Sequence, residues 1–104
     1  MGLLSKLSKG ARVSEFAKSL AGEIALRYPP AINQDSKQHM SVDRLTRVVE
    51  DVCEKARAFC KEQRLGVIGK AKLGNALRWE LEALGYRRDF VEMTTEAVIV
   101  TISR

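Results

Sequence analysis

The residues best suited to chemistry are a single histidine, two cysteines and several closely spaced carboxylates. His39 lies in a polar stretch with no cysteine or carboxylate at metal-ligand spacing, so we interpret it as a solvated loop side chain. Glu80 and Glu82 lie two residues apart and face different sides of a helix, where they cannot share a proton or a substrate. The motifs HExxH, CxxC, GxSxG and the Walker loop do not occur. The sequence therefore predicts a protein that is not an enzyme, with no catalytic residue, no metal site and no cofactor.

The two cysteines, Cys53 and Cys60, lie seven residues apart in a strongly helical segment. This spacing corresponds to a rise of roughly 10 Å, beyond the limit of about 7 Å between the Cα atoms of a disulfide. We expect two free thiols on one buried face, as in reduced intracellular proteins; a bridge between two chains of a dimer is the alternative. No run approaches the roughly 20 apolar residues that span a bilayer. We therefore expect a cytoplasmic protein.

Positive charge gathers in the stretch 64–88. The chain has 18 Lys and Arg against 13 Asp and Glu, a net charge of +5 that favours acidic partners such as nucleic acid. Gly66 and Gly69 precede a helix start, where backbone N–H groups attract phosphate, although they can equally form a tight corner between helices. The candidate binding patch comprises Arg64, Lys70, Lys72, Asn75, Arg78, Trp79, Arg87 and Arg88.

Trp79 is the only tryptophan of the chain and lies off the main apolar stripe of its helix. At about 100° per residue it points roughly 160° away from the direction of Leu77 and Leu81, on the side of Lys72 and Asn75. We expect the N-terminal helix or the C-terminal segment to cover it as part of the core. The alternative is a surface contact with nucleic acid or protein, a use to which tryptophan is well suited.

Helical periodicity predicts a mainly α fold, a compact bundle of three to four helices in one domain, residues 1–104. The first helix, 12–28, repeats apolar residues every three or four positions and ends before Pro29-Pro30, which cannot donate backbone hydrogen bonds. The second, 41–64, can be capped by Ser41. The third, 70–84, precedes Gly85, which fits the left-handed position after a helix end, with Tyr86 placed for the accompanying apolar contact.

The helix 41–64 carries an apolar seam at alternating spacings of three and four, formed by Val42, Leu45, Val49, Val52, Ala56 and Phe59. Because the seam covers only about three heptads and is widened by neighbouring apolar residues, we expect it to face the core. A homodimer built on the seam is the alternative.

The segment 89–103 gives contradictory signals. Asp89 and Glu92 have the spacing of a capping box, which favours a helix. Five β-branched residues in succession, 98–102, favour a strand instead. We expect a fourth helix, because the only available turn lacks Gly, Asn or Asp and an isolated hairpin is marginal. The alternative, a C-terminal β-hairpin, would give the outline of a winged helix and favour DNA binding.

The remaining segments are read as irregular. We expect residues 1–10 to form a mobile N-terminus, with a short basic helix lying on a membrane surface as the alternative. Residues 29–40 are expected to form a loop. Together these features predict a small non-enzymatic helical module that binds a protein partner or a second copy of itself. The alternative function is nucleic-acid binding through the basic stretch 64–88.

Overall fold

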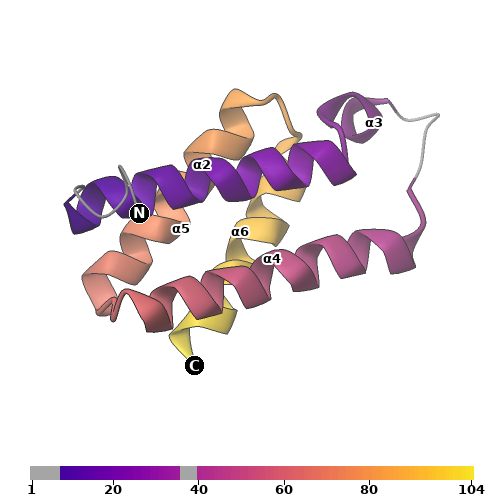
Figure 1. Cartoon of the computed structure of the whole chain (residues 1–104). Coiled ribbons are helices and arrows are strands. Elements are labelled where there is room, and N and C mark those ends of the chain that lie inside the picture. Colours follow the sequence, from indigo (N-terminus) through magenta and orange to yellow (C-terminus); the bar gives the residue numbers. More distant parts are fainter. Residues whose placement is uncertain (1–7, 36–39) are drawn as a thin grey trace.

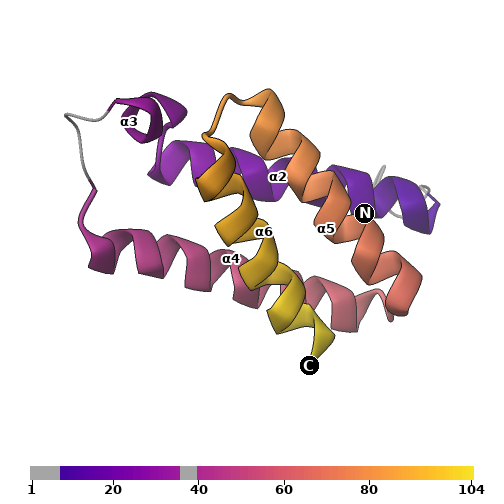
Figure 2. The same cartoon turned by 180° about the vertical axis from the view of Figure 1, so that it is seen from behind.

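The protein folds as a bundle of α-helices. The computed structural model describes residues 8–35 and 40–104, and over these it has five helices and no strand. They are α2 (Lys9–Arg27), α3 (Pro30–Gln34), α4 (Val42–Glu62), α5 (Val67–Ala83) and α6 (Arg88–Ser103). α2 and α4 lie on one side of the molecule, and α5 and α6 cross behind them (Figures 1 and 2). The predicted mainly α bundle is confirmed, but the described residues form five helices and not the predicted three to four.

α2 begins earlier than predicted because Ser8 caps it. The Ser8 Oγ accepts a hydrogen bond from the Ala11 N–H at 3.1 Å, so the helix includes Gly10 in its first turn. α2 therefore includes residues 9 and 10 of the segment 1–10 for which a mobile N-terminus is predicted, while residues 1–7 lie outside the described part. The buried stripe of α2 consists of Val13, Ala17, Leu20, Ala21 and Ile24.

α3 corrects the predicted loop 29–40. Pro30 occupies the first turn of this helix, where the missing N–H of proline has no cost and its fixed φ favours helical backbone. Asn33 and Gln34 then reach the turn after α5: the Asn33 Oδ1 accepts from the Arg87 N–H at 2.7 Å, and the Gln34 amide donates to the Gly85 carbonyl. α3 thus holds the α5–α6 connection in place. Residues 36–39 of the predicted loop lie outside the described residues.

α4 begins as predicted, with the Ser41 Oγ accepting from the Arg44 N–H at 3.2 Å. Its end is closed by Arg64, a non-glycine residue with a positive φ of 53°. The Leu65 N–H donates to the Cys60 carbonyl at 2.9 Å and the Arg64 N–H to the Lys61 carbonyl at 3.2 Å, the paired bonds of a Schellman motif. This turn directs Leu65 into the core.

α5 begins three residues before the predicted start, because Gly66 is its N-cap and Gly69 is accommodated within the helix. Its end is as predicted. Gly85 has a φ of 93°, the Tyr86 N–H donates to the Leu81 carbonyl at 3.3 Å, and the Gly85 N–H donates to the Glu82 carbonyl at 3.0 Å. Tyr86 is buried against Tyr28 and Phe90, with ring centroids 6.0 and 4.8 Å away.

α6 confirms the helix over 89–103, and the hairpin alternative is wrong: the described residues contain no strand. Packing against the bundle outweighs the strand preference of the β-branched run 98–102. Thr94, Thr95 and Val98 are buried together on one side of the helix, whereas in a strand the adjacent residues Thr94 and Thr95 would point to opposite faces. α6 crosses α5 closely at Gly74, where an added Cβ would lie 2.8 Å from Ile99 side-chain atoms.

Candidate functional site

The outer side of α5 carries large apolar side chains in contact with solvent. Ile68 is 79% exposed and Trp79 is 72% exposed. These two residues lie three helical turns apart, within about 20° of each other around the helix, and Asn75 lies between them in the same direction. We call the stripe formed by Ile68, Lys72, Asn75 and Trp79 the α5 outer face.

The expectation that Trp79 belongs to the core is therefore wrong. α5 turns Leu73, Leu77 and Leu81 toward the interior. α2 and α6 are the helices that pack on α5, and α6 approaches it at Gly74 (Figure 2). Because Trp79 is 72% exposed, neither helix covers the indole.

The apolar surface continues from the first turn of α5 onto α6. Val67 is 85% exposed and lines a shallow hollow of about 230 Å³ together with Ala71 and Ile99. Scattered exposed apolar residues are common on protein surfaces, but contiguous ones mark interaction sites. The start of α5 thus presents two strongly exposed aliphatic side chains, Val67 and Ile68.

The predicted binding patch is divided by the structure into separate groups. Arg64 and Lys70 line one hollow where α4, α5 and α6 meet. Lys72 extends toward Gly10 at the start of α2, and Arg78 is half-buried. Arg87 and Arg88 lie at the opposite end of α5, separated from Lys70 by roughly 20 Å of helix. The Arg87 Nε is 3.7 Å from the Asp89 carboxylate.

The hollow that contains Arg64 and Lys70, which we call the basic hollow, has a volume of about 510 Å³. Sequence reasoning missed three of its cations, Arg57, Lys61 and Arg104. Arg57, Lys61 and Arg64 are spaced four and three residues apart, so a search for charge at helical period along 41–64 would have found this row. Its complete lining is Arg57, Cys60, Lys61, Arg64, Leu65, Lys70, Ile102 and Arg104.

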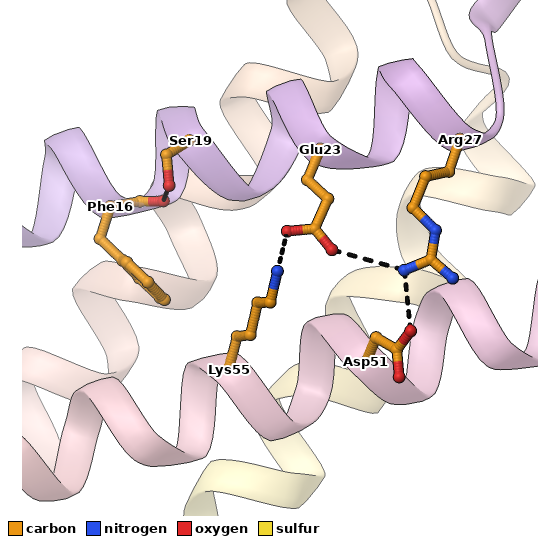
Figure 3. A network of polar contacts seen from close by, with 6 residues as sticks. All are labelled: Phe16, Ser19, Glu23, Arg27, Asp51 and Lys55. Atoms are coloured by element: carbon orange, nitrogen blue, oxygen red, sulfur yellow. Dashed lines mark hydrogen bonds and ion pairs between the residues drawn. The ribbon is translucent and has the colours of Figure 1, made fainter.

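A second large hollow, of about 540 Å³, lies between α2 and α4. Phe16 and Phe59 stack face to face in its wall, with ring centroids 4.0 Å apart. Beyond this pair, the two helices are joined by ion pairs (Figure 3): the Lys55 Nζ lies 2.5 Å from Glu23, and the Arg27 guanidinium lies 2.8 Å from Asp51. The same Arg27 nitrogen also contacts Glu23 at 3.4 Å. These contacts hold α2 and α4 at a distance that leaves an apolar space between them.

Both cysteine thiols lie inside the bundle, away from solvent. Cys53 and Cys60 are free and buried, as predicted from their spacing. Burial raises the pKa of both thiols, and at Cys60 the positive charge of Lys70 acts in the opposite direction. Among the residues in view, no group of three or more His, Cys, Asp or Glu is placed to hold a metal ion. None of the described helices combines the length and apolar character needed to cross a bilayer.

No protein-family model matches this chain, and no match is found among curated proteins or solved structures.

Proposed function

We propose that the protein is a helical interaction module that pairs with a second copy of itself through the α5 outer face. The observation that carries this proposal is the exposure of Trp79 together with Ile68 on one side of a regular helix. Removing about 150–200 Å² of a tryptophan side chain from water is worth about 4–5 kcal/mol before the cost of association. An exposed tryptophan is therefore a strong source of binding free energy.

The stripe is self-complementary when two copies of α5 run antiparallel. In this arrangement Ile68 of one copy lies opposite Trp79 of the other, and the same contact recurs on the other side of the two-fold axis. Lys72 then lies opposite Asn75, whose side-chain carbonyl can accept a hydrogen bond from the ammonium group. A single helical stripe offers less than the roughly 800 Å² per partner of a standard interface. We therefore expect a dimer that forms at micromolar concentration.

Sedimentation velocity across a range of concentrations, combined with the emission of Trp79, tests the proposal. Because Trp79 is the only tryptophan, its emission should shift to shorter wavelength as the dimer forms. Ile68→Glu keeps the reporter and places a carboxylate in the first turn of α5, where it favours the helix, and we expect it to abolish dimerisation. Leu26→Glu is the matched control, since Leu26 is 86% exposed on α2 and lies outside the stripe. A protein that stays monomeric at all concentrations, with constant emission, would contradict the proposal.

The alternative function, nucleic-acid binding, draws support from the same face. Lys72 and Asn75 stand beside an exposed indole, a combination suited to a phosphate and a stacked base. Titration with a single-stranded oligonucleotide at 50 mM salt should then quench Trp79, and 200 mM salt should weaken binding steeply. Unchanged fluorescence at low salt would remove this alternative.

A further inference from the structure

The basic hollow gathers positive side chains from every element that borders it. Arg57 and Lys61 come from the second half of α4, and Arg64 from the turn that follows. Lys70 comes from the start of α5 and Arg104 from the end of α6. Residues from 57 to 104 thus converge on one concave surface. A solvated helix face presents its cations outward in a row, whereas these surround a common space.

The positive charge of the hollow exceeds the negative charge available to balance it. Among the described residues, no Asp or Glu lines the hollow. Glu54 lies nearby, with its carboxylate 3.8 Å from the Arg57 guanidinium. The carbonyl ends of α4 and α6 contribute about half a negative charge each. Against the five cations of the hollow, these groups leave about three positive charges without a counterpart.

The base of the hollow is apolar and neutral. Leu65 and Ile102 are buried there, and so is the Cys60 thiol. Burial raises the pKa of this thiol, so it adds no negative charge near neutral pH. An anion that enters the hollow would therefore meet guanidinium and ammonium donors around its rim and no repelling group beneath it.

We propose that the basic hollow binds the phosphate chain of a small polyphosphate, either free or carried by a nucleotide. Five cations around about 510 Å³ are too many for one phosphate and match a chain of two or three. Arginine side chains hold such oxygens in pairs of parallel hydrogen bonds, and lysine adds a compact charge. The concave shape favours a small ligand over the convex backbone of a nucleic-acid duplex. This proposal is independent of dimerisation through α5.

Isothermal titration of the full chain with sodium tripolyphosphate tests the proposal directly. Lys61→Gln removes one cation from the hollow, and we expect binding to weaken roughly tenfold, the usual effect of losing a charge-assisted hydrogen bond. Arg88→Gln removes the same charge from an exposed residue at the other end of α5 and should leave binding unchanged. An equal loss in both variants would show diffuse attraction to net charge and would overturn the proposal. So would the absence of any tripolyphosphate binding at low salt.

Arg64→Gly separates loss of binding from loss of folding. Arg64 has a positive φ of 53°, a conformation that glycine adopts without the steric cost of a Cβ. We expect this variant to melt roughly 4 °C higher than the parent chain and yet to bind tripolyphosphate roughly tenfold more weakly. A variant that is more stable and binds equally well would remove Arg64 from the site and contradict the proposal.

Two further titrations identify the source of the phosphate chain. If ATP and tripolyphosphate bind equally, the phosphate chain alone is recognised; tighter binding of ATP assigns a contact to the nucleoside as well. Binding of an oligonucleotide without terminal phosphates, combined with no binding of tripolyphosphate, would overturn the proposal in favour of nucleic acid. Trp79→Ala should leave tripolyphosphate binding unchanged even where it abolishes the dimer, so the two proposals fail independently.

Discussion

Two neighbouring threonines of α6, Thr94 and Thr95, are fully buried, and their hydroxyl groups have no hydrogen-bond partner among the described residues. An unpaired buried hydroxyl costs free energy because it has exchanged water for an apolar surrounding. We expect Thr94→Val, which keeps the branched shape, to raise the free energy of unfolding by about 1 kcal/mol. Urea denaturation measures the change. Thr101→Val is the control, since the Thr101 Oγ1 donates to the Ala97 carbonyl at 2.9 Å; it should stabilise less than Thr94→Val or not at all.

Tyr86 should lower the stability of the protein at alkaline pH. Burial, and secondarily the nearby Tyr28, raises the pKa of Tyr86 from 10.0 to about 12. The unfolded chain therefore loses the phenolic proton first, so the stabilisation is complete below pH 10 and is lost as the pH rises through about 12. The loss should be on the order of 2 kcal/mol.

Denaturation at several pH values between 9 and 12 checks the Tyr86 prediction against Tyr86→Phe. The variant lacks the hydrogen bond that the Tyr86 hydroxyl donates to the Tyr28 carbonyl, so we expect lower stability at pH 8. Its stability should nevertheless decline less steeply above pH 10. Parallel curves for the two proteins would show that another group controls the alkaline loss.

At the level of single residues, the sequence predicted burial better than exposure. The spacing of Leu73, Leu77 and Leu81 identified the inner side of α5, because a helix has one direction in which apolar residues recur. The exposure of Trp79 could not be predicted in the same way, since it depends on where α2 and α6 cross α5. The basic hollow depends on tertiary structure for the same reason: Arg57 and Arg104 are far apart in sequence and meet only because α6 ends beside α4.

At the level of elements, α5 and α6 cross closely because residue 74 has no side chain. An alanine Cβ at position 74 would lie 2.8 Å from the Ile99 Cγ1 and Cδ1 atoms. Isoleucine in a helix has one strongly preferred χ1 rotamer, so the contact cannot be relieved without strain. We expect Gly74→Ala to lower the free energy of unfolding by about 1 kcal/mol.

Gly22 provides the matched control for Gly74, because it also lies inside a helix but an added Cβ would meet nothing within 4 Å. Gly22→Ala should stabilise the protein by about 0.5–1 kcal/mol through helix propensity alone. In the background of Ile99→Ala, Gly74→Ala should become stabilising too. A destabilising effect of Gly74→Ala that persists in that background would show that Ile99 is not the obstacle.

Helix ends show which boundaries a sequence can specify. Ser41 and Gly85 were identified because each supplies a local interaction, a side-chain cap and a left-handed backbone. The end of α4 carries no such signal, since Arg64 adopts a conformation usually left to glycine or asparagine. The end of α3 cannot be predicted from local sequence either, because its side chains form hydrogen bonds with Gly85 and Arg87 in the far half of the chain. The helical state of α6 is likewise set by packing in the bundle, which outweighs the strand preference of its β-branched residues.

At the level of the whole molecule, α2 and α4 have the smallest contact among the pairs of helices that pack together. α2 packs mainly on α5 and α4 mainly on α6. The direct α2–α4 link includes the Phe16–Phe59 stack, exposed ion pairs and a hydrogen bond from Arg12 to Gln63 at the end of α4. Exposed ion pairs contribute little to stability and are screened by salt. The two halves of the bundle, α2 with α5 and α4 with α6, are therefore joined chiefly through the α5–α6 contact (Figure 1).

This architecture predicts an uneven distribution of local stability along the chain. Val42 is 79% exposed, and the first buried residue of α4 is Val48, so the beginning of this helix has little tertiary support. By contrast, the centre of α5 is buried against α2 on one side and crossed by α6 on another. Local opening costs least where few apolar contacts are lost.

Native-state hydrogen exchange should therefore show amides 45–48 exchanging through local opening, at free energies several kcal/mol below those of amides 73–81. The α5 amides should exchange only through global unfolding, so their free energies should follow those from urea denaturation and fall together in Gly74→Ala. Equal protection of the two segments would mean that α4 is held along its whole length by contacts that its buried residues do not reveal.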